Sequence, residues 1–170
     1  MMMTSSQAGK KLRKLNEEYL KLLSNEIESK EFRCSLGEDP ESLRPKYDFK
    51  DTQKKISEIE KSIRKLKHSI NQFNTIQVIP EFNITIDEML VYIPQLTKAK
   101  EKLGKMRSGL IKQRYVPSHY ENSNIIDYVI KNYDITEVEA NYNKVSDILA
   151  SAQIALDRVN TSVEYDFDVK

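Results

Sequence analysis

Apolar residues recur at alternating spacings of three and four along two well-separated stretches of the chain. This spacing places the apolar side chains on one narrow stripe of a helix, which is typical of helices that pair in coiled coils. Each stretch therefore predicts a long helix that needs a partner helix. The stripe positions are Phe49, Thr52, Ile56, Ile59, Ile63, Leu66, Ile70 and Phe73 in the first stretch, and Val138, Tyr142, Val145, Leu149, Ala152, Leu156, Val159 and Val163 in the second.

Two further stretches predict the partner helices. Residues 6–32 form an amphipathic stretch whose start we expect Ser5 or Ser6 to cap. Residues 86–112 follow a capping-box pattern of Thr85 and Glu88, and Pro94 is expected to kink this helix near Leu90. The apolar stripes comprise Leu12, Leu15, Tyr19, Leu22, Leu23 and Ile27 in the first, and Met89, Leu90, Ile93, Leu96, Leu103, Met106 and Leu110 in the second.

The segments between these stretches predict loops and short strands. Residues 34–45 contain one glycine and two prolines, which prevent a continuous helix. Residues 75–85 alternate with period two on either side of Pro80, which predicts a short two-stranded excursion, and residues 125–130 form a β-branched and aromatic run typical of a strand. A second capping box, starting at Thr136, predicts the start of the last helix.

These elements predict a mainly α protein. Its four long helices would form antiparallel coiled-coil-like hairpins or a bundle, with β excursions near 75–85 and at 125–130. The chain has 170 residues, a length typical of one domain, so we expect a single helical domain over 1–170 with frayed ends at 1–5 and 164–170.

Composition narrows the picture further. Charged residues make up 31% of the chain and hydrophobic residues 39%, as expected for helices with one buried stripe and a wide solvated face. The net charge is only +1 with the two signs interspersed, so no nucleic-acid partner is expected. The sequence shows no apolar run long enough to span a membrane, so no membrane is expected either. A single cysteine and no recognisable signal segment favour the cytoplasm.

No motif in the sequence indicates a particular catalytic reaction or bound cofactor. The phosphate-loop, nucleophile-elbow and zinc-protease motifs are absent, and we expect no cofactor, no metal and no catalytic residue. His68, His119 and Cys34 are too scattered to make a convincing zinc site. The absence of a recognisable catalytic motif favours a protein without enzymatic activity and leaves the question open.

Polar residues at the predicted helix ends give one candidate ligand site. If the helices run up and down in turn, five residues map to the same end, where they could bind a small ligand or an ion. Helix capping explains the same residues more simply, because asparagine and aspartate favour helix ends. The five are Asn71, Asn74, Thr75, Asp87 and Asn160.

Several short motifs also resemble the septicolysin-like family of small bacterial proteins. The matching positions are Gly37-Glu38-Asp39-Pro40, Ile70-Asn71-Gln72-Phe73-Asn74, Thr85 and Asn160, and they span most of the chain. The chain departs from the family at Asn160-Thr161, where the family has Asn-Trp, and in the third helix, where it lacks the family's Arg-Asp pair. The family label implies a membrane-active toxin component.

Three functions are therefore open. The first is a non-enzymatic helical protein that binds a second copy of itself, most simply as a dimer, or a protein partner through its helix faces. The second is a small-ligand-binding or catalytic pocket at the asparagine-rich end, and the third is the toxin component that the resemblance implies.

Overall fold

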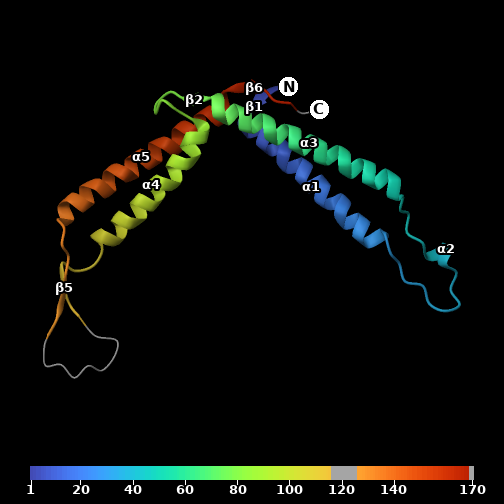
Figure 1. Ribbon diagram of the computed structural model, residues 1–170, viewed down its shortest axis with the longest axis horizontal. Coiled ribbons are helices and arrows are strands. Elements are labelled where there is room, and N and C mark those ends of the chain that lie inside the picture. The colour runs from blue at the N-terminus through green and yellow to red at the C-terminus, as the bar shows by residue number, and fades with distance from the viewer. Residues whose placement is uncertain (116–125, 169–170) are drawn as a thin grey trace. The chain divides into compact units, whose positions relative to one another are not determined.

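A computed structural model of the chain describes residues 1–115 and 126–168 (Figure 1). Helices account for 68% of the described residues, which confirms the mainly α fold class. Four of the helices are long, as predicted, and the fifth is a single turn within the 34–45 loop. They are α1 (Ser5–Ser29), α2 (Pro40–Leu43), α3 (Phe49–Ile76), α4 (Ile86–Arg107) and α5 (Ile135–Ser162).

The strands form three separate two-stranded antiparallel sheets. β2 (Val78–Ile79) pairs with β3 (Ile84–Thr85), which confirms the predicted excursion at 75–85. β4 (Lys112–Arg114) pairs with β5 (Tyr128–Ile130), which confirms the predicted second strand. β1 (Met2–Thr4) pairs with β6 (Glu164–Asp166) near the two ends of the chain.

The chain divides into two compact units. The first comprises Met1–Asp87 and Asp157–Lys170, and the second comprises Glu88–Leu156. The long helices form two antiparallel pairs (Figure 1): α1 with α3 lies in the first unit, and most of the pair of α4 with α5 lies in the second. That the whole chain is one domain stays a prediction.

In the first unit, the predicted stripe of α3 faces α1. Ile56, Leu66 and Phe73 are buried, whereas Phe49 is 63% exposed and departs from the prediction. Ile27, on the stripe predicted for α1, is likewise exposed. Both residues lie where the two helices give way to the 30–48 loop, so the partner helix no longer covers them.

The helix starts differ from the predicted caps at two positions. Thr4, and neither Ser5 nor Ser6, caps α1: its hydroxyl accepts from the Gln7 N–H while the Gln7 side chain accepts from the Thr4 N–H. Asp134 caps α5 by accepting from the Thr136 N–H at 2.7 Å, which places Thr136 inside the first turn. The side-chain oxygen comes from one residue before Ser5 in α1 and from two residues before Thr136 in α5, so each helix begins earlier than predicted.

Residues 2–4 and 164–168, which belong to the segments expected to be frayed, are held in place by strand pairing and packing. Phe167 is fully buried, and its ring lies 5.5 Å from that of Phe73 and 5.0 Å from that of Tyr165. The backbone N–H of Asp168 donates to the hydroxyl of Ser69, a buried polar residue, at 3.1 Å. Aromatic burial and strand pairing therefore fix a segment that has no helical periodicity and gives little signal in the sequence.

In the second unit, Val138, Leu149 and Ala152 of the predicted α5 stripe are buried. α4 ends at Arg107, earlier than the predicted position 112, because Gly109 adopts a φ of 80° that ends the helix. Leu110 therefore lies beyond α4 and is exposed instead of buried. Leu90 is also exposed, so the apolar stripe of α4 is narrower than predicted.

The order of elements repeats within the chain. A strand, a long helix, a connection, a second long helix and a strand occur first from β1 to β2 and again from β3 to β6. The second helices, α3 and α5, have the same length of 28 residues and begin after Asp48 and Asp134, which both act as caps. In this register every stripe position of α3 from Thr52 to Phe73 has a counterpart in α5 from Val138 to Val159. The two halves therefore share one strand–helix–helix–strand order.

Candidate interaction surface

The structure places all five residues of the predicted ligand site within the first compact unit. Asn71, Asn74 and Thr75 lie in the last turns of α3, Asp87 in the first turn of α4, and Asn160 in the last turn of α5. Asn74 and Asn160 are half-buried and the other three are exposed.

Thr75, one of the five, makes a local capping contact. The Thr75 hydroxyl donates to the carbonyl of Gln72 in the preceding turn at 2.8 Å, so it stabilises the end of α3. Asn74 and Asn160 occupy equivalent positions in the two halves of the chain, each followed by a threonine whose hydroxyl bonds backward into its helix. Repetition of a helix end accounts for this pattern, and the ligand-binding role stays a prediction.

Two open cavities of about 460 Å³ each lie between α1 and α3 in the first unit. Neither contains any of the five residues. Glu26 lines one of them and accepts hydrogen bonds from the Tyr47 hydroxyl and the Gln53 side-chain amide, both at 2.7 Å. The bond to the Glu26 carboxylate raises the pKa of Tyr47 above its ordinary value. These contacts tie the helices together and carry no recognisable reactive group.

Other candidate reactive groups are equally isolated. The described residues contain no group of three or more histidine, cysteine, aspartate or glutamate side chains that could hold a metal ion. Cys34 is exposed and its thiol contacts the carbonyls of Ser35 and Glu38. His68 is exposed on α3, and His119 lies outside the described residues. None of the described helices is sufficiently long and apolar to cross a lipid bilayer.

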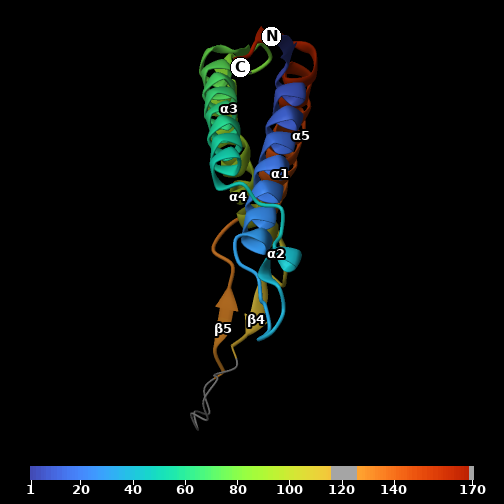
Figure 2. The ribbon, with the colours of Figure 1, turned by 90° about the vertical axis from the view of Figure 1, so that its right-hand side faces the viewer.

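The most unusual surface of the molecule is the ribbon of β4 and β5 beyond the ends of α4 and α5, which we call the β4–β5 ribbon (residues 110–115 and 126–131) (Figure 2). Large apolar side chains normally withdraw from water, and contiguous exposed patches mark interaction sites. Here seven such side chains are each more than half exposed: Leu110, Ile111, Tyr115, Ile126, Tyr128, Val129 and Ile130.

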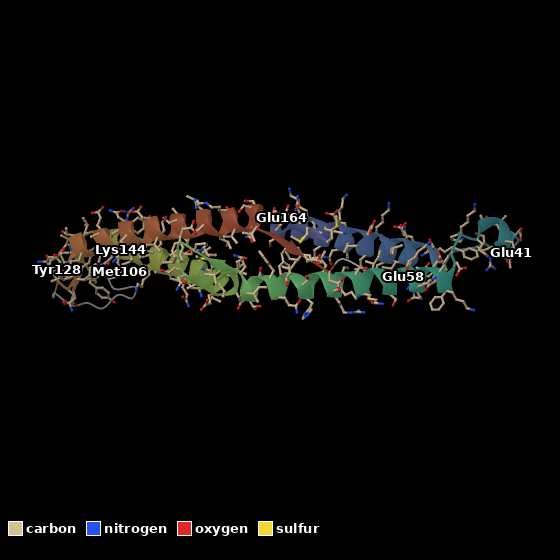
Figure 3. All side chains as sticks on the ribbon, turned by 90° about the horizontal axis from the view of Figure 1, so that it is seen from above. Glu41, Glu58, Met106, Tyr128, Lys144 and Glu164 are labelled. Atoms are coloured by element: carbon tan, nitrogen blue, oxygen red, sulfur yellow. The ribbon has the colours of Figure 1, made fainter. Side chains whose placement is uncertain are left out.

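The base of the ribbon is fixed to the end of α4. The Lys131 ammonium donates to the carbonyls of Met106, Ser108 and Gly109 at 3.0, 2.5 and 3.0 Å, and the Tyr133 hydroxyl donates to the Met106 carbonyl at 2.8 Å. The last carbonyls of a helix have no partner within the helix, so these donors satisfy the end of α4. Figure 3 shows Met106 and Tyr128 at the same end of the α4–α5 pair.

A second set of contacts locks the helices just behind the ribbon. The guanidinium of Arg107 lies 3.9 Å from the centroid of the Tyr142 ring and 3.9 Å from the Glu139 carboxylate. The backbone of Gly104 lies beside the same ring, and a Cβ there would be at an ordinary contact distance of 3.5 Å from Tyr142. The ribbon thus projects from a rigid support.

The two strands of the ribbon differ in character. Lys112 and Arg114 of β4 lie opposite Ile130 and Tyr128 of β5, and the Lys112 ammonium lies 4.1 Å from the centroid of the Tyr128 ring. Cations therefore occupy β4, whereas consecutive apolar side chains occupy β5. This arrangement can bind another polypeptide through side-chain burial and through the free strand edges.

Comparison with known proteins identifies the fold alone. No protein-family model matches the chain, and no curated protein matches it. A crystal structure of a functionally unknown conserved protein from Corynebacterium diphtheriae is similar over 98% of this chain and 100% of that chain, with a TM-score of 0.61 and 15% sequence identity. The resemblance to septicolysin-like proteins stays an expectation drawn from the motifs.

The sequence predicts β5 but does not predict the β4–β5 ribbon as an exposed surface. Its pattern extends the preceding helix over residues 110–112, so β4 is not predicted as a strand and Leu110 is predicted to be buried. Gly109 was the signal that could have revealed it, since a glycine followed by a short apolar and basic stretch is typical of a helix end that turns into a strand. Exposure itself could not be predicted, because an apolar strand is normally buried.

Proposed function

We propose that the protein is a non-enzymatic interaction protein that binds a protein partner through the β4–β5 ribbon. The seven exposed apolar side chains of the ribbon are the observation that carries this proposal. Keeping them in contact with water costs free energy that binding would recover, at roughly 25 cal/mol per Å² of apolar surface removed from water. A monomer gains nothing from their exposure.

The shape of the ribbon supports the same function. An isolated two-stranded ribbon is only marginally stable in water, so contacts beyond the pair add to its stability. The bonds of Lys131 and Tyr133 hold its base in one orientation. Presentation on a rigid support lowers the entropic cost of binding.

A photo-crosslinking amino acid at Ile130 tests this function in cells that produce the protein. The same amino acid at Glu101, an exposed residue of α4 away from the ribbon, is the matched control. We expect cross-linked protein species from position 130 and none from position 101. We also expect replacement of Tyr128 by Asp to abolish the cross-link, because it places a charge in the apolar surface. Equal cross-linking from both positions, or none from position 130, would contradict the proposed function.

A further inference from the structure

The free edges of the β4–β5 ribbon differ in how they would receive another strand. Among the described residues β4 and β5 pair only with each other, so each keeps one open edge. The Tyr115 N–H donates to the Asp127 carbonyl and the Lys131 N–H to the Ile111 carbonyl. Because hydrogen bonding alternates along antiparallel strands, the backbone groups of Tyr128 and Ile130 point away from β4 and toward the open edge of β5.

Positive charges on β4 disfavour the pairing of its edge with another copy of β4, whereas β5 carries no charge that would do so. Any antiparallel pairing of β4 with its own copy would bring Lys112 and Arg114 close to the same cations of the second copy, and like charges across a strand pair are destabilising. Lysine on an edge strand is a recognised device against such pairing. β5 carries only Tyr128, Val129 and Ile130 and has no such protection.

The flanking charges of β5 are self-complementary in one register. In an antiparallel pairing of two copies centred on Val129, Tyr128 of each copy lies opposite Ile130 of the other. Asp127 then lies opposite Lys131 of the second copy, at both ends of the pairing. Residues directly opposite in such a pair share a face of the sheet, so opposite charges lie at opposing positions at each end of the pairing, where a like-charge pair would destabilise it.

We infer that the protein partner of the β4–β5 ribbon is a second copy of this chain, bound edge to edge through β5 with Val129 on the twofold axis. This inference rests on the proposed function and names its partner. The product is a four-stranded antiparallel sheet with an isologous interface that closes on itself, as most homodimers do. The paired segments are short compared with interfaces of about 1,200–2,000 Å², so the dimer is a transient one.

Disulfide trapping tests this geometry. In the full-length chain with Cys34→Ser, the exposed native thiol is removed. Val129→Cys then places two thiols at a non-hydrogen-bonded pair, where Cα atoms lie about 4.5 Å apart, within the range that disulfides require. Gln113→Cys is the matched control, because Gln113 lies opposite Val129 on β4. We expect Val129→Cys to form disulfide-linked dimers at least ten times faster under mild oxidation.

Charge variants test the register independently. Asp127→Lys in the Val129→Cys background places like charges at both ends of the pairing, and we expect it to reduce the trapping rate at least fivefold. Glu101→Lys makes the same charge change at an exposed position of α4, and we expect it to leave the rate unchanged.

Three results would overturn the inference. They are equal trapping of Val129→Cys and Gln113→Cys, faster trapping of Tyr128→Cys than of Val129→Cys, and insensitivity to Asp127→Lys. If trapping fails while the photo-crosslinker at Ile130 captures a different protein, the edge pairing is wrong and the proposed function stands. If both experiments give no cross-link, the proposed function is wrong as well.

Discussion

Leu66 and His68 lie two residues apart on α3, one in the protein interior and the other in contact with solvent. Leu66 is fully buried against α1, whereas His68 is exposed. Leu66→Ala removes buried methyl groups and leaves a cavity, so we expect a loss of about 2–5 kcal/mol in the free energy of unfolding. His68→Ala is the control and should stay within about 0.5 kcal/mol. Chemical denaturation followed by circular dichroism measures both; equal losses would mean that the stripe on α3 is misassigned.

The hydroxyl of Tyr47 gives the first unit a dependence on alkaline pH. Its pKa is raised chiefly by the hydrogen bond to Glu26, so the protonated form favours the folded state. Stability from this bond is fully present below the pKa of unfolded tyrosine, about 10, and is lost as pH rises through the higher folded pKa. We expect Tyr47→Phe to lower Tm at pH 8 and the gap from the unmodified protein to narrow above about pH 10. A gap that is constant with pH would contradict the role of Glu26.

At the scale of single elements, the Lys131 side chain caps the C-terminal end of α4, although Lys131 itself lies outside that helix. Lys131→Met keeps the length of the side chain and removes the donors to the Met106, Ser108 and Gly109 carbonyls. Hydrogen bonds from charged donors contribute about 1.5–3 kcal/mol, so the base of the ribbon should open more often. We expect hydrogen exchange of the backbone amide at position 131, which donates to the Ile111 carbonyl, to accelerate about tenfold or more. Lys144→Met, at an exposed position of α5, should leave the exchange of this amide unchanged.

Helical elements were predictable because their signal is local and repetitive. The α3 and α5 stripes follow from spacing alone, and the β2–β3 pair follows from alternation around Pro80. The caps at Thr4 and Asp134 were displaced by one or two residues, since several neighbouring side chains could each accept the same N–H. Sequence pattern fixes the existence of a helix better than its first residue.

Elements held by distant partners were not predictable in this way. β6 and Phe167 depend on β1, Ser69 and Phe73, which lie far away in the sequence. β4 was hidden inside an expected helix, and the ribbon that it forms became visible only through its exposure. For the candidate site, periodicity predicted β5 as a strand but could not indicate that this strand faces water.

At the scale of the whole molecule, the segment that contains Phe167 completes the buried core of the first compact unit. Phe167→Ala removes a fully buried ring from contact with Phe73 and Tyr165, so we expect a loss of about 3–5 kcal/mol in the free energy of unfolding. Phe49→Ala is the control, because that ring is largely exposed at the start of α3, and it should have little effect. Thermal unfolding of both variants checks this, and similar Tm values would mean that the segment contributes little to the unit.

The pairing of β1 with β6 also fixes the order in which a growing chain can complete its structure. A ribosome makes β1 before β6, so β1 has no partner strand until all four long helices have been synthesised. The unit formed by Glu88–Leu156 is continuous and can fold while the remainder is still being made. Stalled chains that end before Glu164 should therefore contain the paired helices but leave Met3 open to solvent. A strand that precedes every long helix is in this sense completed only after the last of them.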